Sequence, residues 1–165
     1  MKAIRLAVLP LALLLGAAAA QASVEVRFVN PEKFSDANRS VVDRDRVLQA
    51  LQAHLRELGD QQLPGKDLLI EVTDVDLAGE LEPHGRTMEM YRVLRPVTRP
   101  AIDLRFVLSE QGKELRKGQA QLSDLSYMDR FNRYDSNDSL RFEKRMLDEW
   151  FAKEFAAEIK PAAKP

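Results

Sequence analysis

Apolar and polar residues alternate in four stretches of the chain, the pattern of strands that bury one face. The apolar positions are Val24, Val26 and Phe28; Leu68, Ile70 and Val72; Ile102, Leu104, Phe106 and Leu108; and Ala120 and Leu122. The first strand should end at Asn30-Pro31, because proline has no N–H to donate to a sheet. Residues 109–113 suit a hairpin connection between the last two strands.

Two further stretches repeat apolar residues at helical spacing. These positions are Val47, Leu48, Leu51, Leu55 and Leu58 in the first stretch and Leu140, Leu147, Trp150, Phe151 and Phe155 in the second. Ser40 and Asp43 form a candidate N-cap pair for the first helix, and Gly59 is placed to end it. The second helix is expected from about Ser139 to Ile159.

The resulting order is β-α-β-β-β-α, which predicts an α+β fold. We expect two helices packed on one face of a mostly antiparallel four-stranded sheet, because that arrangement buries every apolar stripe.

The first 22 residues have the three parts of a secretory signal peptide. Lys2 and Arg5 are positive, Leu6 to Ala20 is an apolar run, and Ala20-Gln21-Ala22 fits the small-x-small cleavage rule. We expect cleavage after Ala22, export to the periplasm and no membrane anchor in the mature chain. An anchor is the alternative, although the many alanines make the run only marginally able to span a bilayer. A single domain is expected at residues 23–160 and a disordered tail at residues 161–165.

Composition narrows the possible functions. The 165 residues include 25 Lys and Arg against 26 Asp and Glu, a net charge of −1. Removal of the leader leaves about −3, which argues against a nucleic-acid partner. The chain has no cysteine, which excludes disulfides, thiolate zinc sites and cysteine nucleophiles.

A carboxylate-rich segment follows the second predicted strand. Asp74 and Asp76 project to the same side if the backbone stays extended, about 7 Å apart, and Glu80 follows them. Such carboxylates could hold a cation or act as an acid–base pair. The alternative is a set of solvent-facing residues at a strand end. The apolar parity changes between Val72 and Val75, which predicts a bulge or the end of the strand.

The connection from Glu80 to Pro100 exceeds the length of an ordinary loop. Its Arg86 and Arg92 could bind an anionic group such as a phosphate or carboxylate. Alternatively, Met88 to Leu94 includes a strand or helical turn whose arginines are solvated or paired with acidic neighbours.

The segment from Tyr127 to Tyr134 interleaves aromatic residues with arginines. Tyr127, Phe131 and Tyr134 could form an exposed binding patch, because aromatic and arginine side chains stack on ligands and partner proteins. Trp150, Phe151 and Phe155 are expected in the core because of their helical spacing.

Familiar catalytic patterns are missing from the sequence. His54 and His84 lie far apart and do not form a zinc motif, and no G-x-S-x-G, P-loop, G-x-G-x-x-G or H-E-x-x-H occurs. We therefore assign no catalytic residue, metal or cofactor.

Three segments of the chain resemble the bacterial family DUF3016. They are VRFVNPEKFSD at residues 26–36, DVDLAGE at residues 74–80 and FEKRMLDEW at residues 142–150. The resemblance covers about Val24 to Phe151 and implies an exported domain without an assigned activity, so it implies no catalytic residues.

Two functions follow as expectations. The preferred one is a non-catalytic periplasmic module that binds a protein or an envelope component through the Glu80–Pro100 connection and the Tyr127–Tyr134 segment. The alternative is a metal-dependent or carboxylate-based hydrolase centred on Asp74, Asp76 and Glu80.

Overall fold

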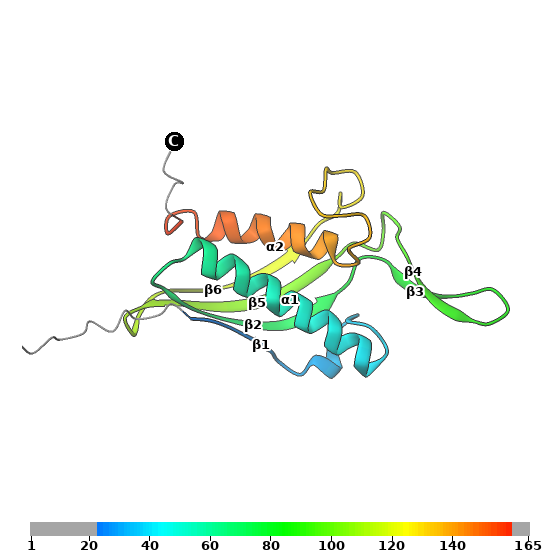
Figure 1. Cartoon of the computed structure of the whole chain (residues 1–165), viewed down its shortest axis with the longest axis horizontal. Coiled ribbons are helices and arrows are strands. Elements are labelled where there is room, and N and C mark those ends of the chain that lie inside the picture. The colour runs from blue at the N-terminus through cyan, green and yellow to red at the C-terminus, as the bar shows by residue number, and fades with distance from the viewer. Residues whose placement is uncertain (1–22, 160–165) are drawn as a thin grey trace, which may run out of the picture.

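The computed structural model describes residues 23–159 (Figure 1). The predicted leader and the last residues of the chain lie outside this range. Along the chain the elements are β1 (Val24–Phe28), the 3-10 helix η1 (Pro31–Lys33), α1 (Val41–Gln62), β2 (Asp67–Asp76), β3 (Glu80–His84), β4 (Glu89–Val93), β5 (Ala101–Glu110), β6 (Lys113–Ser123) and α2 (Arg141–Glu154).

The main sheet has four strands in the order β1-β2-β5-β6. β1 and β2 pair in parallel and are joined through α1, whereas β2–β5 and β5–β6 pair antiparallel. Gln111 and Gly112, which both have positive φ, connect β5 to β6, as expected for a tight two-residue hairpin turn. The predicted α+β class and the mostly antiparallel four-stranded sheet are confirmed.

Apolar residues of the strands and of both helices form one hydrophobic core. Every second residue of β5 from Ile102 to Leu108 is buried, and so is every second residue of β2 from Leu68 to Val72. Burying aromatic and aliphatic side chains is the main favourable contribution to folding. Phe151 and Phe155, predicted as core residues, are completely buried.

The opposite face of the sheet is mostly polar. Arg105 on β5 donates to Glu71 on β2, with Nε 2.7 Å from Oε2. Leu69, Val107 and Lys117 line a hollow of about 330 Å³ on this face. The alternation in sequence therefore records a sheet with one buried and one polar face.

α1 is longer than predicted and runs past Gly59 to Gln62. Its N-cap is Ser40, whose Oγ accepts from Asp43 N–H as predicted. Gly59 is needed for packing rather than for ending the helix, because a Cβ there would clash with Cγ2 of Val24. The glycine lets the last turns of α1 approach β1. α2, in contrast, is shorter than predicted.

The predicted element order lacks two strands. β3 and β4 form a separate two-stranded antiparallel sheet inside the Glu80–Pro100 connection, and in Figure 1 this hairpin projects from one end of the main sheet. Glu89, Met90 and Tyr91 of β4 are all exposed. β4 matches the strand that the sequence offered as an alternative within Met88 to Leu94, whereas β3 was not predicted, because a hairpin with both faces in solvent has no regular alternation of burial.

Within residues 23–159, neither helix combines the length and the apolar character needed to cross a membrane.

Candidate functional sites

The segment from Asp76 to Glu80, between β2 and β3, is the point where separate parts of the chain meet. Three successive N–H groups of this segment donate to three different elements: Leu77 to the carbonyl of Asp36 (2.9 Å), Ala78 to Glu143 Oε1 (2.7 Å) and Gly79 to the carbonyl of Thr98 (2.9 Å). The three segments that carry the family resemblance therefore contact one another here.

Asp74 fixes the loop after η1 to the side of β2. Its Oδ1 accepts from Ser35 N–H at 2.7 Å and its Oδ2 accepts from Ser35 Oγ at 2.6 Å. Asp36 then forms a parallel bridge with Asp76. The predicted register change is present between Val72 and Asp74. Both carboxylate oxygens of Asp74 are thus used in holding the fold.

Arg92 on β4 clamps the loop that contains Asp36. Its Nη1 lies 2.9 Å from Asp36 Oδ2 and its Nη2 lies 3.2 Å from Oδ1, a bidentate pair. Nη1 also donates to the carbonyl of Gly79 at 2.8 Å. The interpretation of Arg92 as an anion-binding residue is therefore corrected: its guanidinium ties β4 to the loop after η1.

Asp76 faces a polar cleft of about 640 Å³. The cleft lies between the 32–39 loop, the 76–81 segment and residues 97–99. Burial and then the neighbouring carboxylates of Asp36 and Asp74 raise the pKa of Asp76. Within residues 23–159, no hydrogen-bond donor reaches its carboxylate, and the charges of Arg92 and Arg99 oppose the rise of its pKa only in part.

Three arginines line the same cleft: Arg39 in the loop, Arg44 in the first turns of α1 and Arg99 before β5. Arg99 Nε donates to Ser123 Oγ at 2.6 Å. None of the three forms an ion pair with another described residue. The cleft therefore carries positive groups on its walls and a carboxylate on β2.

Glu80 also borders the cleft, from the exposed start of β3. Of the three predicted carboxylates, the structure places Asp76 and Glu80 on the cleft, whereas Asp74 holds Ser35. In the described part of the chain, no three His, Asp or Glu side chains are grouped so that they could hold a metal ion.

The β3–β4 hairpin exposes large apolar side chains. Met88, Met90 and Tyr91 are 64%, 42% and 52% exposed, and the predicted candidate Arg86 is exposed at the hairpin tip. At the root of the hairpin, Arg95 Nη2 donates to Glu82 Oε2 at 2.9 Å.

The structure corrects the assignment of Tyr127 to an exposed patch. Tyr127 is completely buried and packs edge-on against Phe142, with ring centroids 4.7 Å apart. Its hydroxyl donates to the carbonyl of Arg95 at 2.8 Å. Tyr127 thus attaches the loop after β6 to the root of the hairpin.

Phe131, four residues later, lies in the opposite environment. Its side chain is 89% exposed, and Leu125 and Met128 of the same loop are also exposed. The backbone beneath it is fixed, because Arg145 Nη1 donates to the carbonyls of Arg130 and Phe131. An aromatic ring is therefore displayed on an anchored loop.

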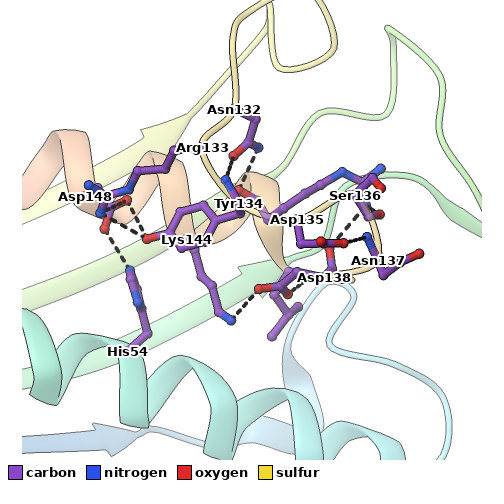
Figure 2. Close-up of polar contacts among 12 residues, drawn as sticks. His54, Asn132, Arg133, Tyr134, Asp135, Ser136, Asn137, Asp138, Lys144 and Asp148 are labelled. Carbon is purple, nitrogen blue, oxygen red and sulfur yellow. Dashed lines mark hydrogen bonds and ion pairs between the residues drawn. The ribbon is translucent and has the colours of Figure 1, made fainter.

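Tyr134 belongs to a polar network between the two helices (Figure 2). Its hydroxyl lies 2.7 Å from Asp148 Oδ2, and His54 Nε2 lies 2.9 Å from Asp148 Oδ1. Burial, together with the hydrogen bond to Asp148, raises the pKa of Tyr134 to about 12. Its hydroxyl therefore serves the packing of α1 against α2, and the interpretation of Tyr134 as an exposed contact residue is corrected.

Glu143 is a buried residue that the sequence interpretation missed. It is 1% exposed, and burial raises its pKa. One oxygen accepts from Ala78 N–H, and the other has no partner among the described residues. A signal was available, since Glu143 occupies the apolar stripe of α2 three and four residues before Met146 and Leu147.

Comparisons with known proteins place the chain in a family. Searches of the curated proteins and of the solved structures found no significant match. The family model described as "Protein of unknown function (DUF3016)" matches residues 22–153, a range that runs from before β1 almost to the end of α2. The chain therefore belongs to the DUF3016 family, as the resemblance of its three segments predicts.

Proposed function

We propose that this protein is a non-catalytic binding module of the bacterial periplasm that recognises a partner protein. The proposed recognition surface includes both faces and the tip of the β3–β4 hairpin, with Met88, Met90 and Tyr91, and the loop residues Leu125, Met128 and Phe131. Arg86 at the hairpin tip adds a positive charge, so the partner should present an apolar surface flanked by an acidic group.

The observation that carries this proposal is the exposure of six large apolar side chains, three on the hairpin and three on the loop after β6. Exposed apolar patches on a folded protein mark interaction sites, and Met, Tyr and Phe are enriched at the centres of protein interfaces. Single exposed apolar residues need no such explanation, but three on one short hairpin and three on one loop do.

Contacts at the root of the hairpin hold the side chains of the recognition surface in place. An isolated two-stranded hairpin is marginally stable in water, yet the root of this one is held by the Arg92–Asp36 pair and by the hydroxyl of Tyr127. Preorganised contact residues lose less conformational entropy on binding. These anchors therefore support binding without themselves contacting the partner.

A hydrolase centred on Asp74, Asp76 and Glu80 is the weaker candidate. The raised pKa of Asp76 in a cleft favours it. Against it, Asp74 is fully hydrogen-bonded to Ser35. Of the three, Asp76 and the exposed Glu80 are left on the cleft, and no hydrogen bond among the described residues orients either of them for the acid–base roles that hydrolysis requires.

The test is photo-crosslinking in cells that natively produce the protein. A photoreactive amino acid at Met90 or Phe131 should give one discrete crosslinked species, whereas the same amino acid at Gln119, on the polar face of the sheet, should give none. Substituting Met88, Met90 and Tyr91 with serine should abolish crosslinking from position 131 and leave Tm nearly unchanged, because exposed side chains contribute little to stability.

The matched control is Leu115→Ser, which changes a residue that is 45% exposed on β6. This variant should crosslink from position 131 as the parent does. Equal crosslinking from all positions, or loss of crosslinking in the Leu115 variant, would contradict a dedicated recognition surface.

A further inference from the structure

The cleft beside Asp76 is separate in chemistry from the recognition surface. It has a volume of about 640 Å³, which lies within the usual range of small-molecule sites. It is lined mainly by charged and polar residues, whereas the exposed surface of the hairpin is rich in Met and Tyr.

On the negative side of the cleft, Asp76 is the half-buried carboxylate, whereas Glu32 and Glu80 line the cleft from exposed positions. Asp36 is neutralised by its bidentate pair with Arg92, and Asp74 accepts two hydrogen bonds from Ser35. Asp76 lies directly beside both and is left without a donor among the described residues. A buried or half-buried carboxylate without a hydrogen-bond partner is unfavourable, so Asp76 gains from a ligand that brings an ammonium or N–H group.

The positive side consists of guanidinium groups. Arg39, Arg44 and Arg99 line the cleft from three different parts of the chain, and none has an acidic partner within residues 23–159. Arginine presents donors in a fork that matches a carboxylate. Arg99 also acts electrostatically on Asp76, so the two kinds of charge lie within reach of one small molecule.

We propose that this cleft binds a small zwitterion, an amino acid or a short peptide with free ends. The ligand's ammonium group lies against Asp76 and its carboxylate against the arginines. Phe34 and Leu81, which also line the cleft, leave an apolar rim for an aliphatic side chain. This inference does not depend on the recognition surface, and either proposal can fail alone.

The experiment measures Tm shifts and calorimetric binding of the full mature chain with three matched probes. The probes are Ala-Ala with free ends, its N-acetyl form and its C-terminal amide. We expect the free dipeptide to raise Tm, and each capped form to bind at least about tenfold more weakly, a difference of about 1.4 kcal/mol. Each cap removes one of the two charges that the cleft recognises.

Variants assign each end of the dipeptide to a residue. Asp76→Asn should abolish the preference for a free amino group but keep the preference for a free carboxylate. Arg99→Gln, or Arg39→Gln with Arg44→Gln, should have the opposite effect. Arg105→Gln on the polar face of the sheet is the matched control and should bind as the parent does. The Tm of each variant without ligand verifies that it folds.

Three results would overturn the proposal. One is the absence of binding by Ala-Ala with free ends. Another is equal binding of the free and the capped dipeptides. The third is a Tm shift with Mg²⁺ or Zn²⁺ alone that Asp76→Asn removes, which would favour the metal-dependent hydrolase instead.

Discussion

Two regions of this protein place polar and apolar side chains in opposite environments. Beneath α2, charged side chains are buried and each is engaged: Arg145, 5% exposed, donates to Asp124 at 2.7 Å and to three backbone carbonyls. On the hairpin and in the 125–131 loop, by contrast, large apolar side chains such as Met90 and Phe131 are exposed. Residue type alone therefore does not reveal which side chains hold the fold and which are left exposed.

The contrast is sharpest within one short segment. Tyr127 and Phe131 belong to the same aromatic–arginine run, yet one ring is completely buried and the other is 89% exposed. Arg145 donates to the backbone carbonyls of both residues, so the same guanidinium holds the backbone of the buried ring and of the exposed one. A buried charge thus positions an exposed apolar group.

The largest expected effect on stability comes from replacing each of these two aromatic residues with alanine in turn. Tyr127→Ala should lower the free energy of unfolding by about 3–5 kcal/mol, because it removes a buried aromatic ring and its hydrogen bond. Phe131→Ala should change it by less than about 0.5 kcal/mol. Urea unfolding followed by tryptophan fluorescence measures both. Similar losses of unfolding free energy in the two variants would show that the two rings contribute equally to the fold, which contradicts the contrast.

A smaller effect is expected from the polar network between the helices. Burial pushes the pKa of Asp148 upward, but hydrogen bonds from His54 and Tyr134 outweigh burial and hold that pKa below its ordinary value. The network therefore stabilises the fold at neutral pH, and its contribution is lost as the pH falls through the lowered pKa. Asp148→Asn should reduce stability at pH 7 by about 2 kcal/mol, in the range for hydrogen bonds to charged groups.

The pH dependence is the sharper readout for this network. The difference between Asp148→Asn and the parent should shrink below about pH 4, where an ordinary aspartate is protonated in the unfolded chain. Glu149→Gln, which removes an exposed partner of Arg130, is the control and should have an effect below about 1 kcal/mol. A pH-independent loss in Asp148→Asn would mean that the residue acts through packing rather than through its charge.

The same contrast explains what the sequence could predict. Elements with one buried face, such as β5 with Ile102, Leu104 and Phe106, leave a period in the sequence. The bulge near Asp74 was predictable because the buried parity changes there. The β3–β4 hairpin left no such period, because Met90 and Tyr91 point to opposite faces and both are exposed.

The candidate cleft could be predicted only in part. Asp76 stood out as part of D-V-D, but its partners Arg39, Arg44 and Arg99 come from three regions that only the fold brings together. The role of Asp36 could not be predicted either, because nothing in its local sequence indicates the ion pair with Arg92. Glu143 was detectable in principle, as a charge on an apolar helical stripe, a position that normally requires a partner.

The smallest expected effect concerns a polar contact at the surface, where β1 begins. Ser23 N lies 3.1 Å and Ser23 Oγ 3.0 Å from Asp67 Oδ1. If the leader is cleaved after Ala22, Ser23 N becomes a positively charged terminus beside this carboxylate, and the contact becomes an ion pair. N-terminal sequencing of the exported protein should therefore begin at Ser23.

In that mature form, Asp67→Asn should lower stability by about 0.2–1 kcal/mol at low salt, and high salt should remove the effect, as for exposed ion pairs. In a chain that keeps residues 1–22, the donors of Ser23 are neutral, so the same substitution breaks no ion pair with Ser23 and its effect should depend little on salt. Lys66→Gln, which breaks the neighbouring pair with Glu110, is the control and should behave alike in both forms. A salt-dependent effect of Asp67→Asn in the uncleaved chain would show that the carboxylate acts elsewhere. The buried charges beneath α2 are present in either form of the chain. The ion pair between the terminus of Ser23 and Asp67, in contrast, can exist only after cleavage of the leader.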